Sequence, residues 1–250
     1  MLEEKEFIMT TTTQTVRQIA LDRPSSIRVF EHFGIDYCCG GRKPLEEACA
    51  ASQIEVNAVL AALESAAAAP ASIAEDWRQI SMEKLVNHIV ATHHAYVKRE
   101  LPRLAVLAQK VVNRHGATMA ELKEIQSALA TLDAELTSHL AKEEAILFPY
   151  IVALDRAGAA GTAKPSGCFG TVANPIAMMT QEHDAAGTLM ARMRNLSGNF
   201  TTPQGACPTF HAFYDGLREF EQDLHQHIHL ENNILFLRAI ELEASWAAVR

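Results

Sequence analysis

Residues 225–236 read HQHIHLENNILF, and residues 139–148 read HLAKEEAILF. Both stretches contain the pattern H-x-x-x-E-x-x-I-L-F, in which a glutamate follows a histidine by four residues. On an α-helix, residues i and i+4 lie on the same face, so each histidine and its glutamate could bind one ion or flank two. The repeated pattern therefore makes the helices that contain it the natural place to look for both fold and function.

Apolar residues around both stretches recur at alternating spacings of three and four, the period of helices that bury one stripe of side chains. We call each such stripe a seam. The later helix has the seam Phe210, Phe213, Leu217, Phe220, Leu224, His227, Glu231 and Ile234. The earlier helix has the seam Leu122, Ile125, Leu129, Leu132, Leu136, His139, Glu143, Ile146 and Tyr150.

Two further helical patterns each place one histidine in a seam. One seam is Val86, Val90, His94, Val97, Leu101, Leu104, Ala108 and Val111, with one step of four where three is expected. The other is Ile176, Met179, His183, Ala186, Met190 and Met193. The four patterns cover 81–113, 117–154, 174–197 and 207–245. They predict an all-α, up-down-up-down four-helix bundle with four histidines and two glutamates in one layer.

Six polar or ionisable side chains in the centre of a bundle need partners, because burying an unpaired carboxylate costs several kcal/mol. Four imidazoles and two carboxylates fit two metal ions, with the carboxylates as bridges. Nitrogen and oxygen ligands without a thiolate favour non-haem iron over manganese or zinc, and a single zinc ion would leave buried groups over. Hydrogen-bonded core histidines without a metal are the alternative interpretation.

A small helical unit precedes the bundle. Its helices are predicted at 15–23, 24–33, 44–52 and 54–66. Gly34 is expected to end the second helix in the left-handed conformation, and Pro44 can open the third. The alanine run and proline in AAAAPASIAED predict a linker, so we divide the chain into a unit at 10–66, a linker at 67–76 and the bundle at 77–250.

Cys38 and Cys39 lie next to each other in the turn of this small unit, before two glycines. Adjacent cysteines do not easily form an unstrained disulfide. We expect the backbone amides of the turn and the charges of Arg42 and Lys43 to lower the pKa of the thiols, which suits a redox or iron-transfer role. Two ordinary turn thiols are the alternative. No role is predicted for Cys49, Cys168 and Cys207.

Two glutamates are candidates for a supporting role near the histidines. Glu135 precedes His139 by one turn, and Glu182 is the neighbour of His183. Either could accept a hydrogen bond from an imidazole or line a route for iron or a gas, with a solvated flank as the alternative. Four histidines lie off the seams and are expected on flanks or at the surface, without a role in metal binding: His88, His93, His225 and His229.

These residues resemble those of a known family. The order H…H-x-x-x-E…H…H-x-x-x-E is similar to that of hemerythrin-like di-iron bundles. FEHFGIDYCCGG at 30–41 resembles the N-terminal domain of the iron–sulfur cluster repair di-iron proteins, the repair of iron centres family. EHDAAG at 182–187 and HIHLENNILF at 227–236 are also similar to that family. The resemblance extends from about residue 14 to residue 240.

The resemblance implies two non-haem iron ions with oxo and carboxylate bridges. The implied ligands are His94, His139, Glu143, His183, His227 and Glu231, and Cys38 and Cys39 match the cysteine pair of the family. It also implies repair of iron–sulfur clusters under oxidative or nitrosative stress, and we expect iron donation to damaged iron–sulfur proteins. Nitric oxide reduction at the centre, or binding or sensing of O2 or NO, are the alternatives. The long loop at 155–173 and Leu237 depart from the family pattern, away from the ligand positions.

The composition indicates which partners and which cellular location to expect. The formal net charge of −8 argues against nucleic acid as the main partner, and 48% hydrophobic residues suffice for a packed core. No apolar run of ~18 residues predicts a membrane span, and the N-terminus lacks the features of a signal peptide. Five cysteines do not suggest a disulfide framework. We therefore expect a cytoplasmic protein, with a homodimer left open.

Overall fold

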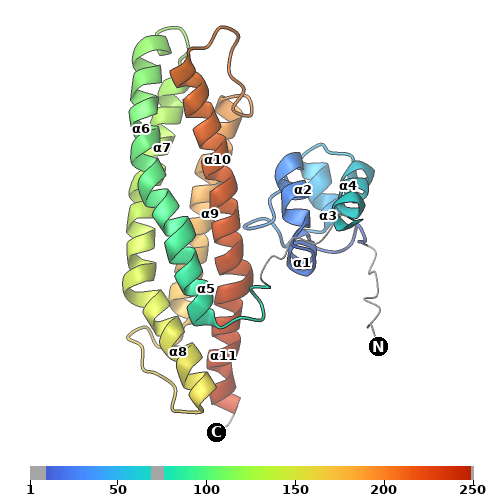
Figure 1. Ribbon diagram of the computed structural model, residues 1–250, viewed down its shortest axis with the longest axis vertical. Coiled ribbons are helices and arrows are strands. Elements are labelled where there is room, and N and C mark those ends of the chain that lie inside the picture. Colours follow the sequence, from blue (N-terminus) through green and yellow to red (C-terminus); the bar gives the residue numbers. More distant parts are fainter. Residues whose placement is uncertain (1–9, 69–75, 249–250) are drawn as a thin grey trace. The chain divides into compact units, whose positions relative to one another are not determined.

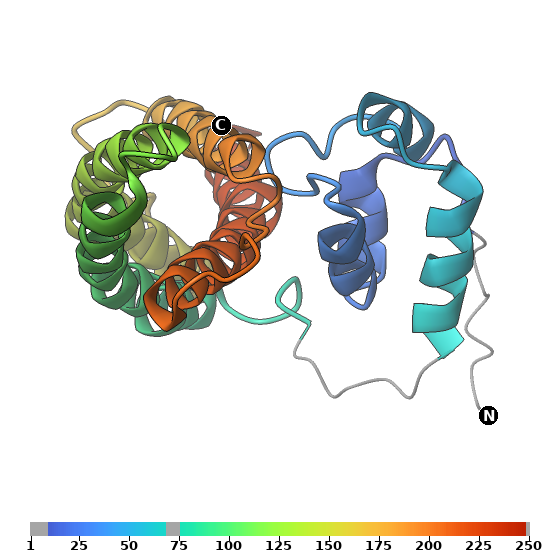
Figure 2. The same ribbon diagram turned by 90° about the horizontal axis from the view of Figure 1, so that it is seen from above.

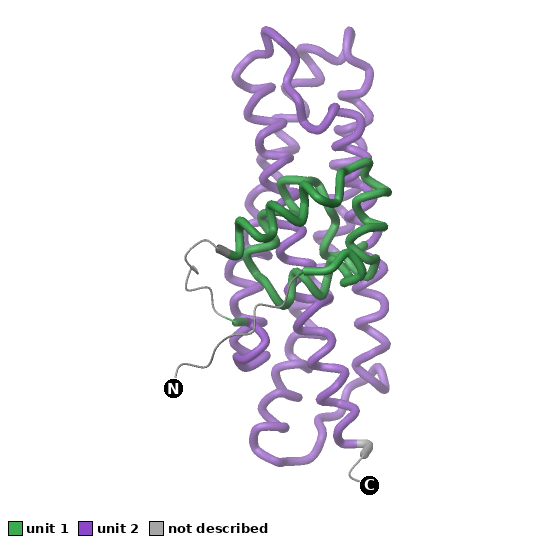
Figure 3. The backbone as a smooth tube through the Cα atoms, turned by 90° about the vertical axis from the view of Figure 1, so that its right-hand side faces the viewer, with its two compact units in different colours: residues 1–76 green, residues 77–250 purple. Residues whose placement is uncertain are grey.

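The computed structural model describes residues 10–68 and 76–248 and divides the chain into two compact units, residues 1–76 and 77–250 (Figure 3). The described residues form helices, with a single isolated β-bridge between Thr15 and Pro44 and no strand. The predicted all-α fold class is confirmed. Most of the predicted linker lies outside the described residues. Among the described helices, none has the length and apolar character needed to cross a membrane.

The described part of the first unit forms four short helices, which are labelled in Figure 1. They are α1 (Val16–Asp22), α2 (Ser26–Phe33), α3 (Leu45–Ala51) and α4 (Val56–Ala68). Local signals decide where they start and stop. Thr15 and Gln18 form a capping box at the start of α1, and Gly34 ends α2 with φ 68° in the left-handed region. Phe30 and Tyr37 are buried in the core that these helices share.

The described residues of the second unit form a bundle of four long helical segments. Figure 2 shows this bundle nearly end on. The first segment comprises α5 (Met82–Ile89), η1 (Val90–His94) and α6 (Ala95–His115). The second comprises α7 (Glu121–Lys142), η2 (Glu143–Leu147) and α8 (Phe148–Ala160). The third is α9 (Ala173–Leu196), and the fourth comprises α10 (Pro208–Leu230), η3 (Glu231–Leu235) and α11 (Phe236–Ala248). The predicted four-helix bundle is confirmed.

Three of the four segments contain a π-helical turn, and each turn lies at a candidate site residue. η1 ends at His94, η2 begins at Glu143 and η3 begins at Glu231. A π turn has one residue more than an α turn, so the helix beyond it is rotated, and such turns are frequent at functional sites. The extra step of four in the first seam, from Val86 through Val90 to His94, coincides with η1.

The predicted seam of the second segment is wrong at Ile146, whereas its last residue, Tyr150, is buried as predicted. Ile146 was expected in the core but is 49% exposed, whereas its neighbour Leu147 is 2% exposed. Ile151 and Leu154 continue the buried stripe from Leu147. The cause is η2, because its additional residue moves the core-facing positions by one along the sequence.

The connection between α8 and α9 is shorter than the sequence predicts, because α8 continues to Ala160. Glu243 of α11 ties this connection to the end of the bundle. Its carboxylate accepts hydrogen bonds from Oη of Tyr150 at 2.6 Å and from Oγ1 of Thr171 at 2.5 Å. The connection is therefore fastened to α11 rather than standing apart from the helices.

Candidate metal centre

The core of the bundle brings the six seam residues together at the level of the π turns. They are His94, His139, Glu143, His183, His227 and Glu231, each at most 1% exposed. The first and third segments contribute one histidine each, and the second and fourth contribute a histidine and a glutamate each. The six form two groups of four that share both glutamates.

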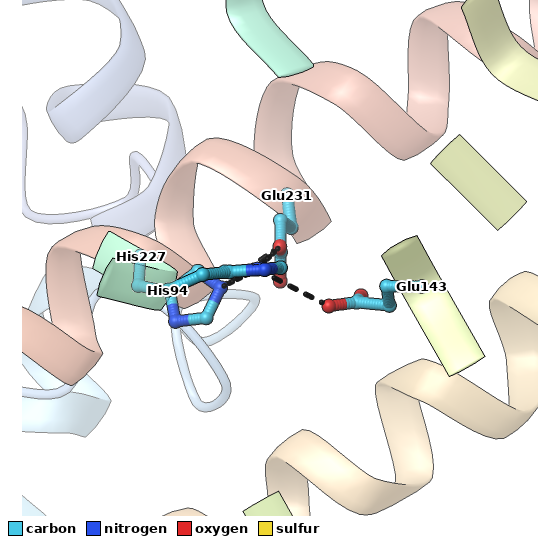
Figure 4. Close-up of side chains that lie close together, drawn as sticks. All are labelled: His94, Glu143, His227 and Glu231. Carbon is cyan, nitrogen blue, oxygen red and sulfur yellow. Dashed lines mark hydrogen bonds and ion pairs between the residues drawn. The ribbon is translucent and has the colours of Figure 1, made fainter. Parts of the chain in front are cut away.

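The first group contains His94, His227, Glu143 and Glu231 (Figure 4), with ligand atoms that lie within 4.8 Å of one another. Nε2 of His94 is 3.1 Å from Nε2 of His227. It is also 3.5 Å from a carboxylate oxygen of each glutamate. Nε2 of His227 is 2.9 Å from Oε1 of Glu231. Four donor atoms from three segments thus point toward one another.

The second group contains His139, His183 and the same two glutamates. Nε2 of His139 is 3.0 Å from Nε2 of His183 and 3.3 Å from Oε2 of Glu143. Nε2 of His183 is 3.0 Å from Oε2 of Glu231. Glu231 therefore contacts the first group through one oxygen and the second through the other.

The donor atoms of both groups fit cations better than they fit each other. Each pair of facing Nε2 atoms can share at most one proton when the imidazoles are neutral. Both carboxylate oxygens of Glu143 are buried without a hydrogen-bond partner, which is costly for an ionised group. Positive ions between the carboxylates and the imidazoles would remove both problems. Two groups of nitrogen and oxygen donors fit two ions of the kind that non-haem iron proteins bind.

The electrostatics of these six groups indicate which protonation states the core favours. Burial raises the pKa of Glu143 well above its usual range, and the charge of Glu231 adds to this. Burial lowers the pKa of His139 to about 4, with a further contribution from His183. Burial also lowers the pKa of His227. His139 and His227 are thus held neutral, the form of an imidazole that binds metal ions.

Glu231 differs from Glu143 although both are fully buried. Burial by itself raises the pKa of Glu231, but interaction with His227 and hydrogen bonds from the imidazoles outweigh it and hold the pKa well below the usual range. Glu231 is therefore the carboxylate that stays charged among the histidines. Glu143 depends on a positive charge that the six residues do not supply.

Three of the four imidazoles have a hydrogen-bond partner at Nδ1, which directs Nε2 into the centre. The pairs are His94 with Glu144 at 2.8 Å, His139 with Glu182 at 2.8 Å, and His183 with Asn232 at 3.0 Å. Partners of this kind fix the tautomer and the direction of a metal-binding histidine. Lys98 and Lys142 in turn bind the carboxylates of Glu144 and Glu182.

Sequence reasoning missed Glu144 and Asn232. A signal for both exists, because each directly follows the glutamate of the repeated H-x-x-x-E pattern, Glu143 or Glu231. Each reaches the histidine of a different segment. Spacing along one helix reveals a shared face but not which neighbouring helix that face meets.

The two glutamates predicted as supporting residues have different surroundings. Glu182 accepts a hydrogen bond from His139, one of the two roles predicted for it. Glu135 is exposed on α7, and His139 uses Glu182 instead of Glu135. Whether either residue lines a route for iron or a gas stays a prediction.

Two of the four histidines expected on flanks or at the surface are buried, so that expectation is wrong for them. His93 is 4% exposed and places Nδ1 2.9 Å from Oδ1 of Asp223. His229 is also 4% exposed and pairs with Asn233 at 2.9 Å. Neither belongs to the two groups of candidate ligands. The extra residue of each π turn rotates the helix, and the buried face of each helix is wider than its seam. Residues beside the seam can therefore be buried as well.

The turn that contains Cys38 and Cys39 is organised by Asp36 rather than by the thiols. The Asp36 carboxylate accepts the backbone N–H groups of Cys38 at 2.9 Å, Cys39 at 3.0 Å and Gly40 at 2.8 Å. The two sulfur atoms lie 3.7 Å apart, and no disulfide joins them. These three groups form a further cluster that could hold a metal ion.

The expected lowering of the thiol pKa is wrong for Cys38. The hydrogen bond with Cys39, burial and the negative charge of Asp36 together raise the pKa of Cys38 well above its usual range. The amides that were expected to stabilise a thiolate are already bound to Asp36. A positive ion beside Asp36 would be needed to turn this environment in favour of a thiolate.

Each of the two units matches a known protein family. The Hemerythrin HHE cation binding domain matches residues 85–239, and a domain of unknown function, DUF542, matches residues 12–67. The iron-sulfur cluster repair protein YtfE of Citrobacter koseri is 36% identical over 227 residues, which are 91% of this chain and 96% of that protein. The chain belongs to this family. The YtfE repair protein of Escherichia fergusonii is 35% identical over the same shares of the two chains.

Membership of the YtfE family covers both the cysteine turn and the bundle, because the matched lengths leave few residues out. The six converging residues all lie within the part that matches the hemerythrin cation binding domain. The donor set and the family therefore agree on a cation-binding bundle.

Proposed function

We propose that this chain is a di-iron protein that repairs iron–sulfur clusters damaged by oxidative or nitrosative stress, and that it does so by donating iron. The observation that carries the proposal is the pair of His/Glu groups that share Glu143 and Glu231 in the core. The names of the YtfE relatives, which describe iron–sulfur cluster repair, support it. We expect this activity in the cytoplasm.

In the proposal, six residues hold two non-haem iron ions with carboxylate and oxo bridges. The ligands are His94, His139, Glu143, His183, His227 and Glu231. Bound iron would supply one-electron redox chemistry, and one ferrous ion is also the cargo. The six residues would bind iron and exclude water, since all six are buried. Burial also lowers the pKa of His139 and His227, which keeps these two imidazoles neutral.

The two glutamates suit different tasks. Glu231 lies 2.9 Å from Nε2 of His227 and 3.0 Å from Nε2 of His183. The imidazole nitrogens nearest to Glu143 are at 3.3 and 3.5 Å, and its oxygens have no hydrogen bond. Glu143 can therefore turn away at a lower cost than Glu231. We assign release of an iron to Glu143 and retention of the other to Glu231.

Cys38 and Cys39 are proposed to receive the released iron through their sulfur atoms, with a carboxylate oxygen of the nearby Asp36 as the third donor. Binding a ferrous ion would displace the proton that the high pKa of Cys38 otherwise retains, because metal ions bind the thiolate. The iron would then pass to the damaged cluster of an iron–sulfur protein. This step gives the cysteine turn a function that the bundle alone lacks.

The first measurement is the metal content of each chain, with the magnetic spectrum of the iron. Two iron ions that couple antiferromagnetically support the proposal, and one zinc ion or no metal overturns it. A damaged [4Fe–4S] protein mixed with the loaded chain then tests repair. The Cys38→Ser/Cys39→Ser variant should keep both irons but lose repair.

A matched control removes two other thiols, in the Cys168→Ser/Cys207→Ser variant, and should repair at the normal rate. Full repair by the Cys38/Cys39 variant would show that the thiol step is wrong. Nitric oxide reduction is tested separately, because two ferrous ions would yield nitrous oxide in a single turnover. Nitrous oxide without any repair would favour the reductase.

A further inference from the structure

Four aromatic rings are in contact one after another, and the series ends at the candidate metal centre. They are Trp77, His88, His93 and His227. The centroids of Trp77 and His88 are 4.1 Å apart in a stacked pair, and those of His88 and His93 are 5.8 Å apart, edge to face. His93 and His227 lie 5.6 Å apart with planes only 5° from parallel. We call this series the ring chain.

The ring chain leads from the surface of the second unit into its core. Trp77 and His88 are half-buried, His93 is 4% exposed and His227 is 1% exposed. Other rings also stack on imidazoles of the centre, but Phe148 and Phe236 are themselves buried. Those contacts remain inside the bundle, whereas the ring chain reaches solvent.

Hydrogen bonds hold both the outer and the inner part of the ring chain. Nη1 of Arg238 donates to the backbone oxygen of Trp77 at 3.1 Å. His93 is fixed by Asp223, whose carboxylate oxygen lies 2.9 Å from Nδ1. Because the bond from Arg238 uses the backbone of Trp77, the side chain can be replaced without losing this anchor.

His227 differs from the other three imidazoles of the centre at its outer nitrogen. Its Nδ1 is buried without a hydrogen-bond partner, where the others have a carboxylate or an amide. The parallel ring of His93 stacks on His227 instead. Among the four histidines of the centre, His227 is the member of the ring chain, and a conjugated ring takes the place of the polar partner that the other three have.

We propose that Trp77, His88 and His93 conduct single electrons between a one-electron donor at the surface near Trp77 and the iron bound by His227. This inference rests on the proposed di-iron centre. Electron tunnelling weakens steeply with each gap between groups, so conjugated rings in van der Waals contact provide a better route than saturated side chains. The contact geometries are the stacked and edge-to-face arrangements that aromatic rings prefer.

The electron balance of each transfer is simple. The donor loses one electron and one ferric ion becomes ferrous, while no bond in the rings is made or broken. Two such transfers reduce both irons. In this scheme, resupply with electrons at Trp77 keeps iron in the ferrous form in which it is released.

The test compares how fast three proteins are reduced: the wild type, Trp77→Leu and Trp246→Leu. Each is loaded with iron, oxidised, and mixed in a stopped-flow instrument with reduced methyl viologen, a one-electron reductant. Trp246 is the other tryptophan of the chain and lies on α11, where its Nε1 donates to the backbone oxygen of Thr162. Trp77→Leu should slow reduction about tenfold, equal to ~1.4 kcal/mol in activation free energy. Trp246→Leu should have no effect.

A second measurement excludes a purely structural role for Trp77. Trp77→Leu should retain the iron content, the ferric spectrum and the midpoint potential of the wild type, and Trp77→Phe should recover much of the rate. Equal rates for Trp77→Leu and wild type would overturn the ring chain, as would a slower rate explained by lost iron or a shifted potential. A wild-type protein without two irons would instead overturn the proposed function.

Discussion

Two carboxylates, one in each unit, have opposite surroundings. Asp36 is exposed in the cysteine turn, where water could solvate it, yet it accepts three backbone N–H groups. Glu143 is fully buried in the bundle, yet neither of its oxygens has a hydrogen-bond partner. The cysteine turn thus completes its polar structure from its own backbone. The bundle core instead buries the Glu143 carboxylate without such partners, so the negative charge of this group needs a cation that the chain itself does not supply.

Removing Glu231 should have the most drastic result, because both groups of candidate ligands contain it. We expect Glu231→Ala to lose both metal ions, while the cysteine turn stays intact. Metal content by mass spectrometry measures this. Glu135→Ala, an exposed glutamate one turn from His139, serves as the control and should retain both ions. Two ions in Glu231→Ala would contradict the assignment of Glu231 as a bridge.

Removing a side chain that forms a hydrogen bond with a metal-binding imidazole should reduce the affinity for metal ions without abolishing metal binding. Asn232→Ala removes the hydrogen bond to Nδ1 of His183 and should lower metal affinity about 10–100-fold. The neighbouring Asn233→Ala is the matched control, because Asn233 pairs with His229 outside the centre. Titration with a competing chelator measures both. Equal affinities would mean that Asn232 does not orient His183.

Glu143 should show opposite effects with and without metal. In the metal-free protein, Glu143→Leu removes a buried unpaired carboxyl and should raise the free energy of unfolding by about 1–3 kcal/mol. In the loaded protein, the same substitution should lower it, because metal binding stabilises only the folded state. Denaturant unfolding of the metal-free and the loaded protein measures the change in the free energy of unfolding in each form. A destabilised metal-free variant would show that Glu143 is already satisfied.

Removing the Asp36 carboxylate should destabilise its surroundings, whereas removing the Glu143 carboxylate should stabilise the metal-free protein. Asp36→Ala leaves three amides without their acceptor and should lower the local stability of the turn by ~1 kcal/mol, since water can partly replace the carboxylate. Hydrogen exchange at the amides of Cys38, Cys39 and Gly40 measures the loss. If exchange at these amides stays as slow as in the wild type, Asp36 does not organise the turn.

His225 should matter least. It is half-buried on α10, and its side chain is in neither group of candidate ligands. His225→Ala should leave metal content unchanged, whereas His227→Ala, two residues on, should lose an ion. The same metal analysis compares the two. Loss of metal from His225→Ala would show that the seam selects the wrong histidine.

Much of the fold could be predicted because its signals are local. The ends of α1 and α2 follow from a capping box and from Gly34. The uninterrupted helix α9 follows its predicted seam throughout, from Ile176 to Met193, with every seam residue buried. At the π turn η2 the prediction fails, as the exposed Ile146 and buried Leu147 show, whereas the predicted Ile234 in η3 is buried.

The sequence by itself determined which residues share a helix face, because a period of 3.6 residues orients side chains whatever surrounds them. That was sufficient to select six residues that meet in the core. Only the tertiary structure decided the contacts between helices: Glu144 at His94, Asn232 at His183, and His93 stacked on His227. It also decided that Asp36, and not a thiolate, binds the amides of the cysteine turn. Such contacts depend on which faces meet and at what height, which no spacing along a single helix contains.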